Sequence, residues 1–468
     1  MILEDFMNAS PVNFFAVETI KKCLTEAGYK EWKAGEPCPE VKSGDKLFST
    51  KNGSAIFAFH MGRKTLAEGG MRIISAHSDS PCFRVKPNAE IKCEGGLVKL
   101  NTELYGGAIM STWMDRPLSL AGRVVLAGEC MTEPVVRLLR INRPILTIPN
   151  LAIHFNRQVN DGVALSKQKD MLPVLTTENG KRKTENGTDA GSESRSKVCF
   201  DYAERQGGKD REAGLKLESE NEKGILKTLV AEELGVKAED ILDFDLYLYD
   251  TTPAGRVGLH GELIQSGRLD DLSMAHAGME ALLADADTPE VTKCLAIFDN
   301  EETGSQTKQG AGSPFFASLV QRLVARQSET CASHFEDFAM CVERSFMVSA
   351  DNAHAWHPNY SEKYDPTNHP VMGGGPVIKY NASQKYLSDA VGASVFMQAC
   401  KKAGAPYQTF VNHSDVAGGS TLGNILSSSF PVKGVDMGNP IWGMHSVRET
   451  ASMQDHENCI KVFTAFLG

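Results

Sequence analysis

The sequence predicts an α/β fold in which a largely parallel sheet carries helices on both faces. After Gly267 the chain alternates short apolar runs with amphipathic segments, an alternation typical of parallel sheets with crossover helices. Other apolar runs come before residue 92, where a stretch rich in glycine and in short alternating segments begins. We therefore expect a discontinuous three-layer α/β domain, residues 1–91 and 257–468, interrupted by an inserted β-rich domain over residues 92–256.

The first part of the chain predicts a helix, a hairpin and a strand. Val17, Ile20 and Leu24 share one face of a helix expected over residues 12–28. Asn52-Gly53 predicts the turn of a hairpin, because this pair favours the tight turns that join antiparallel strands. The run over residues 71–77 predicts a strand that leads directly into His77.

The middle of the chain predicts short antiparallel strands, as in the alternation over residues 123–128. The polar segment over residues 177–214 predicts a surface loop whose basic side chains are solvated. A helix is expected over residues 225–234 and a strand over 244–248. In the last part, helices are expected over 271–285, 313–326, 384–402 and 454–466, and strands over 294–298, 345–350, 376–380, 408–411 and 433–437.

Composition excludes several classes of protein. The chain has 468 residues, enough for two domains, and its net charge of −10 argues against nucleic-acid or anionic-membrane partners. Eleven cysteines without a Cys-x-x-Cys pair argue against a disulfide framework and against a zinc knuckle. No apolar stretch approaches the about 20 residues that span a bilayer, and the first residues lack the features of a signal peptide. We expect a cytoplasmic protein.

Acidic and imidazole side chains recur just after the predicted strands, where a parallel sheet presents its carboxyl edge. Such mixed donors suit zinc, or manganese or cobalt. A pair of ions about 3.5–4 Å apart requires a bridging carboxylate, a carboxylate and a histidine for each ion, and a spare carboxylate as base. Taken singly, each residue also has an ordinary role, such as capping a helix. The groups are His77-Ser78-Asp79, Asp270-Asp271, Glu301-Glu302, Asp351 to His354, and His445.

Six ordered motifs resemble the signature of the M18 metallo-aminopeptidases, the family of aspartyl aminopeptidase and aminopeptidase I. The resemblance covers nearly the whole chain, and residues 8–11 are also similar to the start of the family. The motifs lie at residues 76–87, 267–270, 299–305, 349–360, 375–379 and 444–449.

The resemblance implies a site with two zinc ions, one of which could be replaced by cobalt or manganese. It implies that His77 and Asp351 bind one ion and that Glu302 and His445 bind the other. Asp270 would bridge the two ions. By the same resemblance Glu301 is the general base and Asp79 orients His77.

The resemblance also implies substrate contacts and an assembly. The implied substrate contacts are His354, Lys379 and Tyr386. His154, in the inserted domain, would reach the active site of a neighbouring subunit. The inserted domain would then serve dimerisation, and the dimers would build a tetrahedral dodecamer.

The implied activity is removal of the amino-terminal residue of a peptide. We expect a neutral or broad preference for the first side chain (P1), because residues 412–421 match the family only loosely and the polar insert near 177–214 is longer than in acidic-specific members. The alternatives are a strictly acidic aminopeptidase, in which Lys379 pairs with Asp or Glu, and another metal-dependent amide hydrolase. A non-enzymatic scaffold is disfavoured, because it needs no base beside two metals.

Overall fold

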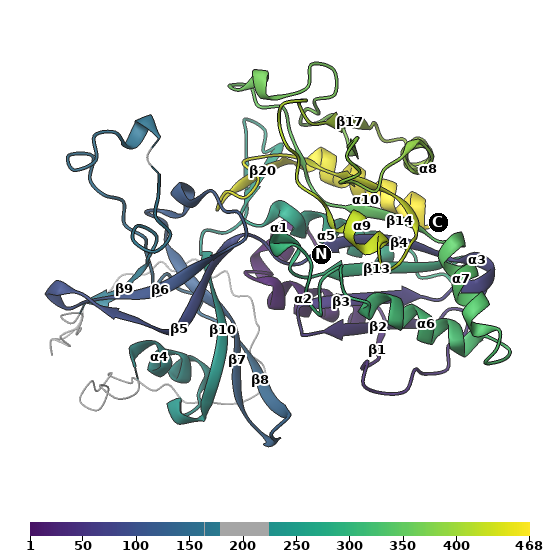
Figure 1. The fold of residues 1–468 in the computed structure, drawn as a ribbon, viewed down its shortest axis with the longest axis horizontal. Coiled ribbons are helices and arrows are strands. Elements are labelled where there is room, and N and C mark those ends of the chain that lie inside the picture. Colours follow the sequence, from purple (N-terminus) through teal and green to yellow (C-terminus); the bar gives the residue numbers. More distant parts are fainter. Residues whose placement is uncertain (163, 178–223) are drawn as a thin grey trace, which may run out of the picture.

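The chain forms two bodies built on different sheets (Figure 1). In the computed structural model, which describes residues 1–162, 164–177 and 224–468, the larger body contains a nine-stranded sheet. The smaller body contains a six-stranded antiparallel sheet formed by the middle of the chain.

The nine-stranded sheet is parallel at its centre and mixed toward its edges. Its central strands, β13, β4, β14 and β18, are mutually parallel and almost wholly buried, which explains the apolar runs in β13, β4 and β14. In order across the sheet, the strands are β1 (Lys30–Glu31), β2 (Lys46–Lys51), β3 (Ala55–His60), β13 (Thr292–Phe298), β4 (Met71–His77), β14 (Phe346–Ala350), β18 (Lys433–Gly438), β16 (Val377–Tyr380) and β17 (Gln408–Val411).

Helices cover both faces of this sheet and enclose two apolar cores. Alternate side chains of β4 enter opposite cores, since Ile73 packs into one and Ile74 into the other. The helices on the Ile74 face are α1 (Leu3–Ala9), α2 (Asn13–Glu26), α5 (Leu269–Leu283), α8 (Ala390–Ala403) and α10 (Met453–Leu467). Those on the Ile73 face are α3 (Leu66–Gly69), α6 (Phe315–Gln327), α7 (His334–Arg344) and α9 (Leu422–Ser427).

The six-stranded sheet packs against helix α4 (Ile225–Leu234) and has an apolar core of its own. Its strands, in order, are β8 (Glu133–Arg140), β7 (Leu118–Cys130), β10 (Ile241–Asp250), β5 (Cys82–Lys92), β6 (Leu97–Tyr105) and β9 (Val174–Thr177). A third, five-stranded sheet contains β11 (Gly255–Val257), β12 (Leu263–Ser266), β20 (Glu449–Ser452), β19 (Pro440–Trp442) and β15 (Ala353–His354).

The predicted α/β class is confirmed, and most of the predicted elements are present. The helix expected over 384–402 was placed too early: α8 begins at Ala390, because the Asp389 side chain accepts a hydrogen bond from the Gly392 amide and caps the helix. Helices α1, α3, α7 and α9 were not predicted. The loop expected over 177–214 lies, apart from its first residue, outside the described residues. Within the described residues, no helix is both long and apolar enough to cross a membrane.

Candidate metal centre

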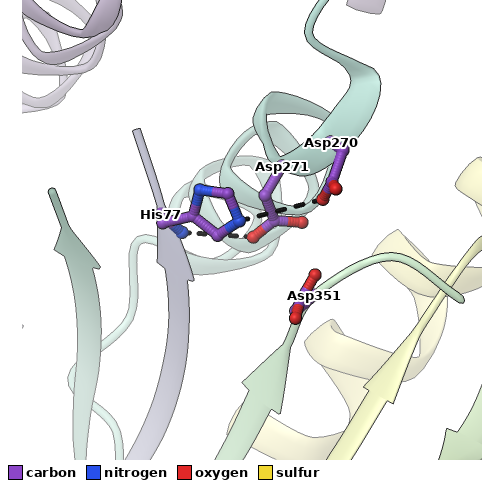
Figure 2. Close-up of side chains that lie close together, drawn as sticks. All are labelled: His77, Asp270, Asp271 and Asp351. Carbon is purple, nitrogen blue, oxygen red and sulfur yellow. Dashed lines mark hydrogen bonds and ion pairs between the residues drawn. The ribbon is translucent and has the colours of Figure 1, made fainter. Parts of the chain in front are cut away.

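Carboxylates and histidines from separate segments converge at one edge of the nine-stranded sheet. His77 is the last residue of β4, Glu301 and Glu302 follow β13 in a short 3-10 helix (Glu301–Thr303), and Asp351 follows β14. Because these three strands are parallel, their carboxyl ends lie together. Asp270 enters from the start of α5 and His445 from the turn before β20. Figure 2 shows His77, Asp270 and Asp351 facing a common space.

Asp270 belongs to two donor sets. Its Oδ1 lies 3.8 Å from His77 Nε2, and its Oδ2 lies 3.5 Å from His445 Nε2. On the second side, Glu302 Oε2 lies 3.3 Å from the same His445 nitrogen. The donor atoms of His77, Asp270, Asp271 and Asp351 lie within 4.8 Å of one another, and so do those of Asp270, Glu302 and His445. The structure thus brings together all five sequence-predicted ligands around one shared carboxylate.

Asp271 lies in the same cluster, although the sequence interpretation gave it no role. It is fully buried, and its Oδ2 accepts a hydrogen bond of 3.1 Å from the His77 amide, as Figure 2 shows. In the sequence, its position directly after Asp270 could have indicated that it belongs to the cluster. The contact fixes the main chain of His77 relative to the start of α5.

Asp79 contacts other parts of the site in addition to the ring of His77. His77 Nδ1 lies 3.0 Å from the main-chain oxygen of Asp79 and 3.4 Å from its carboxylate. The carboxylate also accepts hydrogen bonds from the amides of Glu301 and Glu302, at 3.1 and 3.2 Å. Tyr105, at the end of β6 in the smaller body, donates to it at 2.7 Å. Asp79 therefore holds the acidic pair after β13 in register with His77, a role that its spacing from His77 did not reveal.

The electrostatics of the cluster fit divalent cations. Two carboxylate oxygens, Asp270 Oδ1 and Glu302 Oε1, are buried and have no hydrogen-bond partner among the described residues. Burial raises the pKa of Glu301 to about 8, and the neighbouring carboxylates add to the effect. Crowded buried carboxylates of this kind are costly unless a positive charge neutralises them. The nitrogen and oxygen donors are those that zinc prefers.

The predicted substrate contacts lie beside this cluster. Lys379 is buried, and its Nζ donates to the Asn352 carbonyl oxygen at 2.8 Å and lies 3.3 Å from Asp351 Oδ2. The same nitrogen lies 5.6 Å from the centre of the Tyr386 ring. His354 lines a cavity of about 340 Å³. Other side chains of its wall are His357, Tyr360, Lys363, Tyr364, Phe410, Asn412 and His413.

His154 is apart from these residues. It lies in an exposed turn, flanked by Ile153 and Phe155, whose side chains are 53% and 80% exposed. Among the described residues, none of the contacts that build the cluster involves His154. The structure of the single chain therefore does not bring His154 to the site.

Comparisons with known proteins identify the family. The model of the family described as aminopeptidase I zinc metalloprotease (M18) matches residues 6–467. A probable M18 family aminopeptidase 2 from Clostridium novyi is 44% identical, over 99% of this chain and 97% of the relative. A relative of the same description from Clostridium acetobutylicum is 43% identical, with the same coverage.

Solved structures agree in fold. A chain in the cryo-EM structure of the Ape4 and Nbr1 complex is 32% identical and superposes with a TM-score of 0.85, over 99% of this chain and 84% of that one. Its sequence and its fold are thus both similar to those of the present chain. Together with the matches above, this similarity shows that the chain belongs to the M18 family of zinc aminopeptidases, which hydrolyse peptides from the amino end.

Proposed function

We propose that this aminopeptidase works with two zinc ions per chain. The observation that carries the proposal is the shared carboxylate of Asp270, whose two oxygens face different histidines. His77 and Asp351 would hold one ion, Glu302 and His445 the other, and Asp270 both. One of the two positions could also accept cobalt or manganese, because nitrogen and oxygen donors bind all three metals.

Glu301 is the proposed general base. Zinc bound at this site supplies Lewis acidity toward the peptide carbonyl and lowers the pKa of a coordinated water. Glu301 lies beside His77 and Glu302, and its amide is fixed by Asp79. Its carboxylate would take a proton from the attacking water and return it to the leaving amine. His354 would donate a hydrogen bond to the carbonyl oxygen as negative charge develops there.

A neutral or broad P1 preference is the first candidate for specificity. Lys379, the residue expected to anchor an acidic side chain, already pairs with Asp351 and with the Asn352 carbonyl oxygen. The cavity that His354 lines includes the apolar surfaces of Tyr360, Tyr364 and Phe410. These surfaces would bury an apolar side chain, which is favourable by about 1.5–3 kcal/mol.

A strictly acidic preference is the second candidate, and one observation favours it. The wall of the same cavity carries His357, Lys363 and His413, and no carboxylate lines it among the described residues. Lys363 carries a positive charge and the two histidines each offer a ring N–H donor, a combination that suits a carboxylate ligand. Part of this wall, from Asn412 to Gly419, belongs to the stretch that matches the family signature only loosely.

The proposed assembly is a tetrahedral dodecamer built from dimers, with the inserted body at the dimer contact. The solved mApe1 of S. cerevisiae, which has the same fold, is a dodecamer. The exposed apolar side chains around His154 fit an interface, because monomeric proteins rarely expose such clusters. We further propose that the catalytic domain comprises residues 1–91 and 257–468, although β5 of the smaller body already begins at Cys82.

A panel of substrates tests the proposed activity and its specificity. Peptides that differ only in their first residue are incubated with the zinc-loaded enzyme, and the released amino acids are identified by mass spectrometry. Release of Leu or Ala at rates comparable with Asp supports the neutral or broad preference. Release of only Asp and Glu establishes the acidic alternative. Cleavage from the carboxyl end, or of acetylated peptides at the same rate, contradicts an aminopeptidase.

A further inference from the structure

Glu449 connects the main chains of two proposed metal ligands. It is the first residue of β20 and is 1% exposed. Its Oε2 accepts a hydrogen bond of 3.0 Å from the Asp270 amide, and its Oε1 accepts one of 2.7 Å from the His445 amide. One carboxylate therefore spans the start of α5 and the turn before β20.

These two contacts hold the residues whose separation determines the geometry of the site, Asp270 and His445. Asp270 Oδ2 and His445 Nε2 are 3.5 Å apart, and any ion shared by both residues depends on that separation. Both amides belong to the ligand residues themselves, so a displacement of Glu449 would move the ligands directly. Donor positions in metal sites are held by such partners, whose loss typically weakens metal binding or activity by about 10–100-fold.

The main chain of His445 has a conformation that must be held by contacts with its surroundings. Its φ of +69° is left-handed, a conformation that is unfavourable for a residue with a side chain. Its carbonyl oxygen accepts a hydrogen bond from Ile109, and its Nδ1 lies 3.1 Å from the Gly107 carbonyl oxygen. Both contacts come from the smaller body. Glu449 supplies the contact from the larger body, and it ties His445 to Asp270.

We propose that Glu449 is a positioning residue of the metal centre. Its carboxylate sets the separation of Asp270 and His445, and thereby the affinity for the zinc ion that these two residues share with Glu302. The proposal rests on the two-zinc function above. It predicts that a change at Glu449 weakens binding of this ion more than binding of the ion beside His77, because the first ion depends on both displaced residues and the second only on Asp270.

A purely structural role is the competing explanation, and Asp455 provides a matched control. Asp455 is also fully buried, and its carboxylate accepts hydrogen bonds from the amides of Gly373 and Gly375, at 2.6 and 2.8 Å. It thus also accepts two main-chain hydrogen bonds, but both amides belong to one segment, which carries no proposed metal ligand. Asp455→Asn and Glu449→Gln each replace one acceptor oxygen with an NH₂ group that faces an amide donor.

Zinc binding to the full chain tests the proposal without reference to activity. Metal-free wild type, Glu449→Gln and Asp455→Asn are equilibrated with zinc buffered by a chelator, and bound zinc is counted by atomic absorption. We expect two ions on wild type and on Asp455→Asn. On Glu449→Gln we expect the ion shared with His445 to be weakened by about 10–100-fold and the ion beside His77 to be weakened less. Thermal unfolding is measured alongside, and both variants should lose stability.

Each other outcome has a defined meaning. Equal zinc affinities for Glu449→Gln and wild type overturn the positioning role. Equal weakening by Asp455→Asn overturns it as well, because the effect would then be general destabilisation. Fewer than two ions on wild type would instead contradict the proposed function. If Glu449→Gln does not fold, Glu449→Asp replaces it: this side chain keeps a carboxyl group but is too short to span both amides, so the same unequal weakening of the two ions is expected.

Discussion

Glu301 and Glu302 are adjacent in sequence but have different surroundings. Glu302 Oε2 lies 3.3 Å from His445 Nε2, and its side chain is 4% exposed. Glu301 belongs to the donor set around His77, and the ion-pair contacts of Asp270 and His445 do not include it. Both carboxylates lie near His77, and Glu302 also lies beside His445, so one short segment could provide both a ligand and a base.

The sequence predicted the residues of the cluster better than the contacts that hold them. His77, Glu301 and Asp351 could be placed together because each follows a strand of one parallel sheet. Asp79, Tyr105 and Glu449 act through main-chain amides or side chains of distant segments: Tyr105 lies in the other body, and Glu449 is 179 residues from Asp270. Hydrogen bonds of this kind leave no periodic pattern in a sequence, so only the fold reveals them.

At the scale of elements, apolar periodicity predicted the buried strands and the long helices. Apolar periodicity did not predict elements that bury few side chains. Helix α7 buries only Cys341 and Val342, so its apolar stripe was too narrow to be recognised. The start of α8 depends on a cap and not on periodicity, because apolar residues such as Tyr386 and Leu387 precede the cap at Asp389 and extend the pattern.

The packing of β3 predicts a dependence of stability on pH. His60, at the end of β3, is 1% exposed. In the sheet it lies opposite Lys46 of β2 on one side and Lys293 of β13 on the other. Burial, together with these lysines, lowers the pKa of His60 to about 4, while Asp285 opposes the shift. In the unfolded chain the histidine pKa is about 6.5. As the pH falls, the unfolded chain is therefore protonated at His60 before the folded chain is. The contribution of His60 to the free energy of unfolding is therefore fully present above about pH 6.5 and is lost as the pH falls toward 4.

Unfolding of wild type and His60→Gln by urea at pH 7.5 and pH 5 measures this contribution. Glutamine does not titrate, and the other histidines are common to both proteins. Wild type should lose about 2 kcal/mol more stability than the variant between these pH values. An equal loss in both proteins would show that His60 is not the group responsible.

At the scale of the whole molecule, the smaller body takes part in the site. Tyr105 reaches Asp79, while Gly107 and Ile109 hold His445. These residues lie at and just beyond the end of β6. The inserted body thus contributes contacts within its own chain. The further contribution proposed for His154 would come from a neighbouring chain, and no pattern in the sequence reveals the geometry of such an assembly.

Mixed assemblies test the proposed role of His154. His154→Ala lacks the donated histidine, and Glu301→Gln lacks the base, so each alone should be nearly inactive. When both are co-expressed, some sites combine an intact Glu301 with His154 from a Glu301→Gln neighbour. With random mixing across a pairwise contact, about one quarter of the sites should be active. No recovery in the mixture, or full activity of His154→Ala alone, would contradict the role.

In the proposed mechanism, two zinc ions and Glu301 together perform the hydrolysis. The most direct measurement determines the zinc content and kcat of Glu301→Gln beside those of wild type, with Glu302→Gln as the control. Glu301→Gln should keep two ions and lose about a thousandfold in kcat, because it lacks the base, whereas Glu302→Gln should lose both zinc and activity. Undiminished kcat in Glu301→Gln, or loss of zinc in step with its activity, would contradict the account.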